Sequence, residues 1–222
     1  MTNVRYDHLT GQAAYQSSNF DGEKPTDYRL SINVRRKVQK LGMNAGFNLY
    51  AYGNLYYSFS NDVVNRTKSS SYIVQGTISK SVEDKFDIYL NAGPGYVVSQ
   101  SSLQSANNNG KSFNADGGLT IYFPGKIQFS SDAQYTYLAK TQIFDRSFHQ
   151  VLLNATLARK FFKKENLQLA LSGNDLLNQN TGFNRVANYN VIQQTQESTI
   201  RRYIKLAVIW NFTHEGGASG QN

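Results

Sequence analysis

Apolar and polar residues alternate along much of this 222-residue chain. The pattern is longest over Met43–Phe59, where one parity carries Ala, Phe, Leu and Tyr and the other carries mainly Asn, Tyr and Ser. Successive side chains of a strand point to opposite faces, so this segment predicts a strand with an apolar face and a polar face. Its 17 residues far exceed the usual strand length of about 5–6. Long two-faced strands are typical of a barrel that spans a membrane and is wet inside.

Nine further segments carry the same alternation, so the chain predicts about ten strands, with the weakest pattern in the first. They are Val4–Ser17, Thr26–Lys37, Ser70–Val82, Phe86–Ser99, Ser112–Phe123, Ile127–Lys140, Ser147–Phe161, a strand beginning with Leu167–Leu171 and a last one over Ile204–Phe212. We therefore predict an all-β fold, an antiparallel up-and-down transmembrane β-barrel over residues 1–213, with a flexible tail at 214–222. The sheet is expected to close without a free edge, either as ten strands or as part of a larger barrel.

The predicted links between strands are short and long in turn. Short links lie at Val38–Gly42, Glu83–Lys85, Pro124–Lys126 and Lys163–Asn166, and long ones at Phe20–Pro25, Ser60–Ser69, Ser101–Lys111 and Asn178–Ser198. In outer-membrane barrels the short turns are periplasmic and the longer loops are extracellular. An even number of strands then predicts that both chain ends lie on the periplasmic side.

Aromatic residues fall near both ends of the predicted strands, as two girdles at the membrane interfaces would require. The predicted girdle at the short-turn end consists of Phe86, Phe123, Phe129, Phe161, Trp210 and Phe212. Three aspartates, Asp87, Asp116 and Asp132, share a parity with the polar residues of their strands. We predict that they face the lumen, where they either tune what passes or are simply solvated.

Composition narrows the class of protein. Hydrophobic residues make up 40% and mean hydropathy is −0.51, which is too polar for a helical membrane protein. Cysteine is absent, so disulfides and thiolate metal sites are excluded. The net charge is +8, and basic residues cluster beside predicted turns. Their position favours solvated strand ends over a groove that binds nucleic acid. We expect outer-membrane lipid and the barrel-assembly machinery as partners, and no nucleic acid.

The first residues lack the apolar stretch of a signal peptide, so we expect a mature form or part of a longer chain.

Candidate catalytic chemistry is sparse. His8, His149 and His214 lie far apart, without the spacing of metal ligands. Asp145 and His149 raise the possibility of an outer-membrane hydrolase, but residues four apart on a strand are about 13 Å apart. No nucleophile motif accompanies them. We therefore predict no enzymatic activity, no metal and no cofactor.

The end of the chain resembles a known family. It carries N-D-L-L-N over Asn174–Asn178, then Gly182–Arg185, and R-Y followed by W-x-F over Arg202–Phe212. These motifs resemble the C-terminal barrel end of the TonB-dependent-receptor-like outer membrane proteins of Bacteroidetes. The resemblance implies part of a barrel of about 22 strands with a plug, which imports large nutrients with energy passed from the inner membrane. In such a turn, Asn174–Asp175 are expected to hold an extracellular loop by hydrogen bonds to its backbone.

The chain departs from the full pattern of that family in its lack of a plug and an energy-coupling box, in its smaller number of strands, and in its extension over Thr213–Asn222. Two main hypotheses follow. In the first, the chain is the C-terminal barrel part of a transporter and works with an N-terminal plug and barrel segment and an energy-coupling protein. In the second, it is a small self-contained barrel with an adhesin or structural role.

Overall fold

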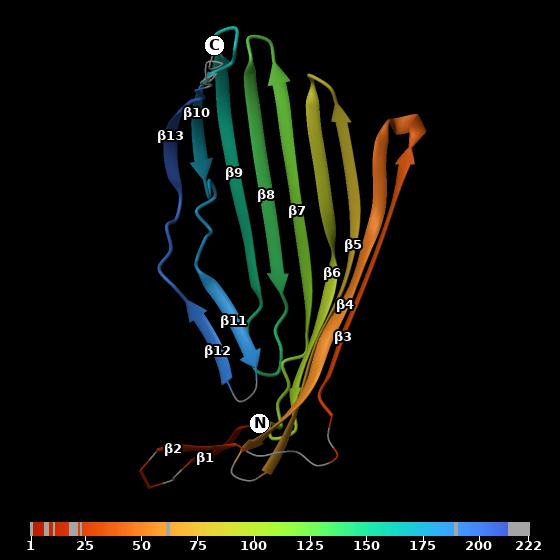
Figure 1. The fold of residues 1–222 in the computed structure, drawn as a ribbon, viewed down its shortest axis with the longest axis vertical. Coiled ribbons are helices and arrows are strands. Elements are labelled where there is room, and N and C mark those ends of the chain that lie inside the picture. The colour runs from red at the N-terminus through yellow and green to blue at the C-terminus, as the bar shows by residue number, and fades with distance from the viewer. Residues whose placement is uncertain are drawn as a thin grey trace, which may run out of the picture.

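Nine strands of 8 to 20 residues form an up-and-down antiparallel series in the computed structural model (Figure 1). The structure describes residues 2–6, 9–10, 12–17, 22, 24–60, 63–188 and 191–212. The nine are β3 (Thr26–Val38), β4 (Met43–Ser60), β5 (Val63–Val82), β6 (Phe86–Ser101), β7 (Gly110–Phe123), β8 (Ile127–Leu138), β9 (Phe148–Phe161), β10 (Leu167–Asn174) and β13 (Tyr203–Trp210). Each pairs with the next along the chain, which is the predicted all-β, up-and-down order. No helix in these ranges is long and apolar enough to cross a membrane.

The strand register brings the apolar parities of neighbouring strands onto one face. Leu49 of β4 lies opposite Ile32 of β3 and Val74 of β5. The same face continues across the sheet, where Ile121 of β7 lies opposite Phe86 and Phe129. The alternation in the sequence therefore defines one apolar face and one polar face, as predicted.

No protein layer from the described residues packs on the apolar face. Among the described residues, only four hydrophobic side chains are buried, namely Tyr57, Phe144, Ala158 and Ala170. Leu30, Val74 and Leu206 on the apolar face are 49%, 48% and 71% exposed. An apolar surface of this extent on a monomer indicates contact with another apolar phase, and a β-barrel offers such a surface to lipid.

Two glycines on the polar face allow neighbouring strands to approach closely. A Cβ atom at Gly46 would overlap the carbonyl oxygen of Val34, and one at Gly93 would overlap that of Val74. The strand interior needs glycine at these positions because no side chain fits there. Glycines used in this way let a sheet curve, and the ribbon in Figure 1 is visibly bent.

The short turns all lie at one end of the sheet, at the top of Figure 1. The turn between β3 and β4 is a single 3₁₀ turn, η1 (Gln39–Leu41), which ends at Gly42 with a φ of 57°. The turns between β5 and β6 and between β7 and β8 are equally tight, with positive φ at Asp84 and at Gly125–Lys126. These links agree with the predicted short turns.

The first predicted strand, Val4–Ser17, is wrong. The segment forms two strands of five residues, β1 (Thr2–Tyr6) and β2 (Ala13–Ser17), which pair antiparallel as a hairpin. β1 also pairs in parallel with the end of β4 at Phe59 and Ser60, beyond the point where β3 begins. The weak alternation of this segment reflects strands too short to span a membrane.

Two of the predicted long links contain strand residues that the sequence pattern did not predict. Most of Ser60–Ser69 belongs to β5, and β4 pairs with β5 as far as Ser60 opposite Val63. The predicted loop Asn178–Ser198 contains a separate hairpin of β11 (Phe183–Asn188) and β12 (Val191–Gln196). Polar segments can form strands because ladder hydrogen bonds do not require an apolar face.

Both outer strands of the nine-stranded series have a free edge. β3 pairs only with β4, and β13 pairs only with β10, so the described part of the chain does not close into a ring. With nine strands instead of ten, β3 begins at the loop end and β13 ends at the short-turn end (Figure 1). The expectations of a closed ten-stranded ring and of both chain ends on one side are therefore wrong, whereas the other alternative, part of a larger barrel, stays a prediction.

Candidate functional site

The polar face of the sheet carries the three aspartates predicted to face a lumen. The Asn91 side-chain amide donates to Asp116 Oδ2 at 2.9 Å, from β6 to β7. The Asn154 amide donates to Asp132 Oδ2 at 2.7 Å, from β9 to β8. These carboxylates therefore join neighbouring strands by charge-assisted hydrogen bonds.

Asp87 on β6 joins three strands. Its carboxylate accepts hydrogen bonds from the Ser81 hydroxyl of β5 and from the Tyr122 hydroxyl of β7, the latter at 2.9 Å. All three aspartates thus hold strands together across the polar face. That they face the lumen of a complete barrel stays a prediction.

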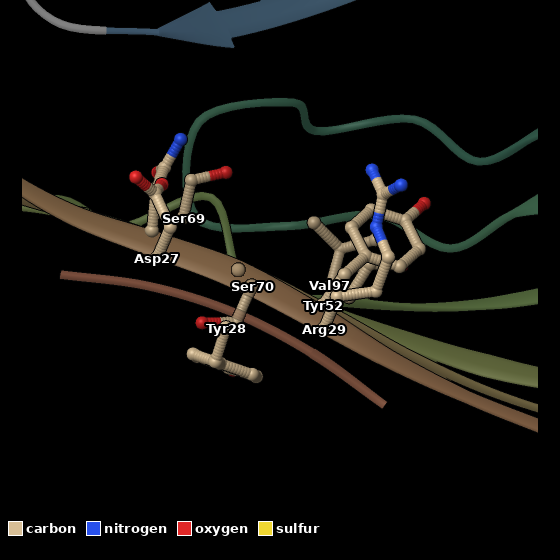
Figure 2. Close-up of a pocket in the computed structure, with 10 residues that line it drawn as sticks. Asp27, Tyr28, Arg29, Tyr52, Ser69, Ser70 and Val97 are labelled. Atoms are coloured by element: carbon tan, nitrogen blue, oxygen red, sulfur yellow. The ribbon is translucent and has the colours of Figure 1, made fainter. Parts of the chain in front are cut away.

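A second part of the polar face is open. Figure 2 shows Asp27 and Arg29 of β3 on the same side of the sheet as Tyr52 of β4, with Tyr28 on the opposite side. These polar-face residues border a hollow of about 700 Å³, together with Asn54, Ser69, Ser71 and Val97. Three residues of the apolar parity, Tyr28, Gly53 and Ser70, also line it. Within the described residues, the side chains of Asp27, Arg29 and Tyr52 form no hydrogen bond or ion pair. The hollow can therefore offer a carboxylate, a guanidinium and a phenol to a solute.

No motif in the sequence marks this hollow. The parity of Asp27, Arg29 and Tyr52 places each of them on the polar face, but their proximity depends on the β3–β4 register. That register sets Asp27 opposite Asn54 and Arg29 opposite Tyr52. Counting residues outward from the short turn that ends at Gly42 gives the hairpin register, and this register would have predicted that Arg29 lies opposite Tyr52.

The six aromatic residues of the predicted short-turn girdle lie at or just beyond that end of the sheet. Phe86, Phe123, Phe129, Phe161 and Trp210 share the apolar face, and Phe212 follows β13. Trp210 has ring-centroid distances of 6.1 Å to Phe162 and 6.0 Å to Phe212. Their contact with a membrane interface stays a prediction.

Charged side chains bridge two short turns at the same end. Glu165 forms ion pairs of 3.1 Å with Lys126 and 3.0 Å with Lys160. The hydrogen bond from Lys160, followed by that from Lys126, holds the pKa of the Glu165 carboxyl below its ordinary value. The β7–β8 turn is thereby tied to the β9–β10 turn.

The expected role of Asp175 is confirmed. Its carboxylate accepts hydrogen bonds from the backbone N–H groups of Gln179 at 2.9 Å and Asn180 at 3.0 Å. Its own N–H donates to the Asn154 side chain at 2.9 Å, and the residue is buried. The motif after β10 thus orders the start of the long loop.

Asp145 and His149 do not form a catalytic pair in the described part of the chain. Asp145 lies in the exposed link before β9, whereas His149 lies within β9 opposite Tyr137 on the apolar face. No hydrogen bond joins their side chains among the described residues. The same residues contain no group of three potential metal ligands. His8, His214 and the predicted tail at 214–222 lie outside the described residues.

A comparison with protein families identifies the class of this barrel wall. No curated protein and no solved structure matches the chain. The model of a family described as "Outer membrane protein beta-barrel family" matches residues 58–213. Those residues run from the end of β4 through β13 and make up more than half of the chain. The chain therefore belongs to the outer membrane protein β-barrel family, and it resides in the bacterial outer membrane.

Proposed function

We propose that this chain forms the C-terminal barrel wall of a TonB-dependent-receptor-like transporter that takes up a large solute. Membership of an outer-membrane barrel family supports the architecture. The finer assignment rests on the terminal motifs, on the free edges of the sheet and on the open polar hollow. Of these, the free edges carry the proposal.

An unpaired strand edge is costly inside a membrane. β3 has 13 residues and β13 has eight, and each pairs along one side only. Each backbone N–H or C=O group left unpaired in hydrocarbon costs several kcal/mol, roughly, because no water is present to replace the ladder hydrogen bond. Both edges therefore require further strands.

The strand directions restrict what can close the sheet. β3 and β13 both run from the loop end to the short-turn end, so pairing them directly would create a parallel seam. Single-chain bacterial barrels have an even number of antiparallel strands. An odd number of additional strands restores that pattern, as expected if an N-terminal barrel segment completes a larger ring.

The polar face supports passage or capture of a solute within that ring. The aspartate pairs stiffen the wall near its middle, whereas Asp27 and Arg29 beside the hollow have no hydrogen-bond or ion-pair partner among the described residues. The hollow lies toward the loop end, where an incoming solute would first meet the barrel.

Uptake in the source bacterium tests the transport function. Deletion of the coding region should abolish uptake of one or more large solutes, and loss of the energy-coupling protein should abolish the same uptake. A self-contained adhesin would instead lose surface attachment with uptake unchanged. Unchanged growth on every large nutrient that the parent strain uses would contradict the proposal.

A further inference from the structure

The apolar face of the described strands carries charge of one sign only. Register places six cationic residues on it and no carboxylate, whereas every aspartate of these strands lies on the polar face. The six are Arg36, Arg66, Lys68, Lys80, Lys111 and Arg159. They lie toward the two ends of the strands and leave an apolar band between them.

Two of these cationic residues border one hollow at the loop end. Arg66 and Lys68 of β5 line a hollow of about 460 Å³ with Gln100, Ser101, Ser102, Gln104, Ser105 and Asn107. This lining contains hydroxyl and amide groups and no carboxylate. Neither cation forms an ion pair with a described residue. The hollow therefore has a positive charge that the described chain does not neutralise.

The wall of this hollow is held in place by hydrogen bonds. The fully buried Asn65 side chain accepts hydrogen bonds from the hydroxyls of Ser101 at 2.8 Å and Ser102 at 3.3 Å. Ser102 N–H donates to the Arg66 carbonyl at 3.0 Å, and its hydroxyl accepts from Arg66 N–H at 2.9 Å. The link after β6 is thus fixed against β5 at the position of the two cations.

The position of the hollow relative to the apolar band points to its ligand. Along the apolar parity of β5, the exposed Ile78 and Val74 are followed by Tyr72 and then by Lys68. Tyr72 lies opposite Tyr96 of β6. Tyrosine is enriched where hydrocarbon meets headgroups, and Lys68 lies about 13 Å further along the strand. The order hydrocarbon, interface and cation matches the acyl chains, linkage region and phosphate of a lipid.

We propose that the hollow beside Arg66 and Lys68 binds a phosphate group of a phosphorylated lipid in the outer leaflet. Arginine can bind phosphate through two parallel hydrogen bonds, and lysine adds a point charge. The side-chain amides of Gln100 and Gln104 supply neutral donors beside the two cations. Since the long loops are extracellular, the bound lipid belongs to the outer leaflet. This proposal needs the membrane location of the protein and not its transport function.

Lipid retention by the assembled protein, extracted from outer membranes in detergent, tests the proposal. The probes are bisphosphorylated lipid A and its dephosphorylated form, each added to delipidated protein and counted by native mass spectrometry. The parent protein should retain the bisphosphorylated form at a concentration about tenfold lower or more, as loss of charged hydrogen bonds predicts. Arg66→Gln with Lys68→Gln should lose this preference. Lys163→Gln with Lys164→Gln, at the opposite end, should keep it.

Two further measurements are a charge-conserving variant, which controls for misfolding, and competition by inorganic phosphate, which distinguishes lipid phosphate from free phosphate. Arg66→Lys with Lys68→Arg should keep the preference, because both charges remain. Inorganic phosphate should displace the lipid only at far higher concentration. Equal retention of both lipid forms by the parent protein, unchanged preference in the double glutamine variant, or displacement by equimolar inorganic phosphate would each overturn the proposal. If the double glutamine variant does not assemble, Lys68→Gln alone is compared in the same way.

Discussion

At the residue scale, the polar face separates side chains that hold the wall together from side chains left free for a ligand. Asp87, Asp116 and Asp132 each accept a hydrogen bond from a neighbouring strand, whereas Asp27 and Arg29 have no such partner in the part of the chain that the structure describes. Parity in the sequence placed the three predicted aspartates on one face. Their partners could not be predicted, because a cross-strand partner depends on the register between strands and not on the residue's own segment.

Asp116→Ala should destabilise the barrel by about 1–3 kcal/mol, because it leaves the part-buried Asn91 amide without its acceptor. Asp145→Ala is the matched control, since Asp145 is exposed in a link and accepts no hydrogen bond among the described residues. Urea titration of the assembled protein in detergent, followed by heat-modifiable migration, measures both. Equal midpoints for the two variants would show that the Asn91–Asp116 bond contributes nothing.

Gly93→Ala should cost about 1–3 kcal/mol, because the new methyl group overlaps the Val74 carbonyl oxygen and forces β5 and β6 apart. Gly76→Ala provides the comparison in the same strand pair, because its nearest neighbour would be the Ala92 oxygen at 3.8 Å, an ordinary contact. The same titration measures the difference. A Gly93→Ala protein as stable as the Gly76→Ala protein would contradict the close approach.

At the element scale, strands that lie within the apolar band were predictable and strands outside it were not. β4 and β6–β9 begin and end within a few residues of their predicted bounds, because a lipid-facing parity marks every second residue. The outer part of β5, the β1–β2 hairpin and the β11–β12 hairpin carry no such mark. Their pairing is set by backbone hydrogen bonds and turn geometry, so their sequences look like loops.

The turn that carries Glu165 should make stability depend on pH. The pKa of the Glu165 carboxyl in the folded protein is lower than the unfolded value of about 4.3. The ion pairs of Glu165 therefore stabilise the folded protein fully above about pH 4.3. The contribution is lost as pH falls through the lower, folded pKa. Glu165→Gln should therefore flatten the loss of stability below about pH 4.3, measured by thermal melts in low salt.

Glu83→Gln, in the turn between β5 and β6, is the control for this pH effect. Glu83 forms no ion pair with a described residue, in contrast to Glu165 with its contacts to Lys126 and Lys160. Its replacement should leave the acid limb of the stability curve unchanged. Identical curves for the two variants would mean that the Glu165 ion pairs add no stability.

At the scale of the whole molecule, the sequence did not predict whether the sheet closes into a barrel by itself. Hydrophobic periodicity describes each strand separately and contains nothing about the partner of an outermost strand. The ten-strand count failed because Val4–Ser17 folds back as a hairpin, and with it failed the placement of both chain ends on one side. The polar and apolar faces, by contrast, depend only on parity and were predicted correctly.

Engineered cysteines can report whether β3 meets β13, since the chain has no cysteine of its own. In the assembled protein, Leu49→Cys with Val74→Cys should form a disulfide, because these residues are direct cross-strand partners. Ile32→Cys with Leu206→Cys, on β3 and β13, should remain reduced if other strands lie between them. Rapid cross-linking of the second pair, read on non-reducing gels, would favour a small ring closed by this chain.

The β4–β5 ribbon projects beyond its neighbouring strands at the loop end, which affects what first contacts this protein at the cell surface. Beyond Leu55, β4 no longer pairs with β3, and only its last two residues, Phe59 and Ser60, pair with β1. Between Val63 and Arg66, β5 does not pair with β6. Four residue pairs, from Tyr57 opposite Arg66 to Ser60 opposite Val63, continue beyond the pairing with β3 and β6, a length of about 13 Å. A bacteriophage or an antibody that approaches the bacterium would therefore touch this prong, with the β1–β2 hairpin paired to its end, before it reached the rest of the wall.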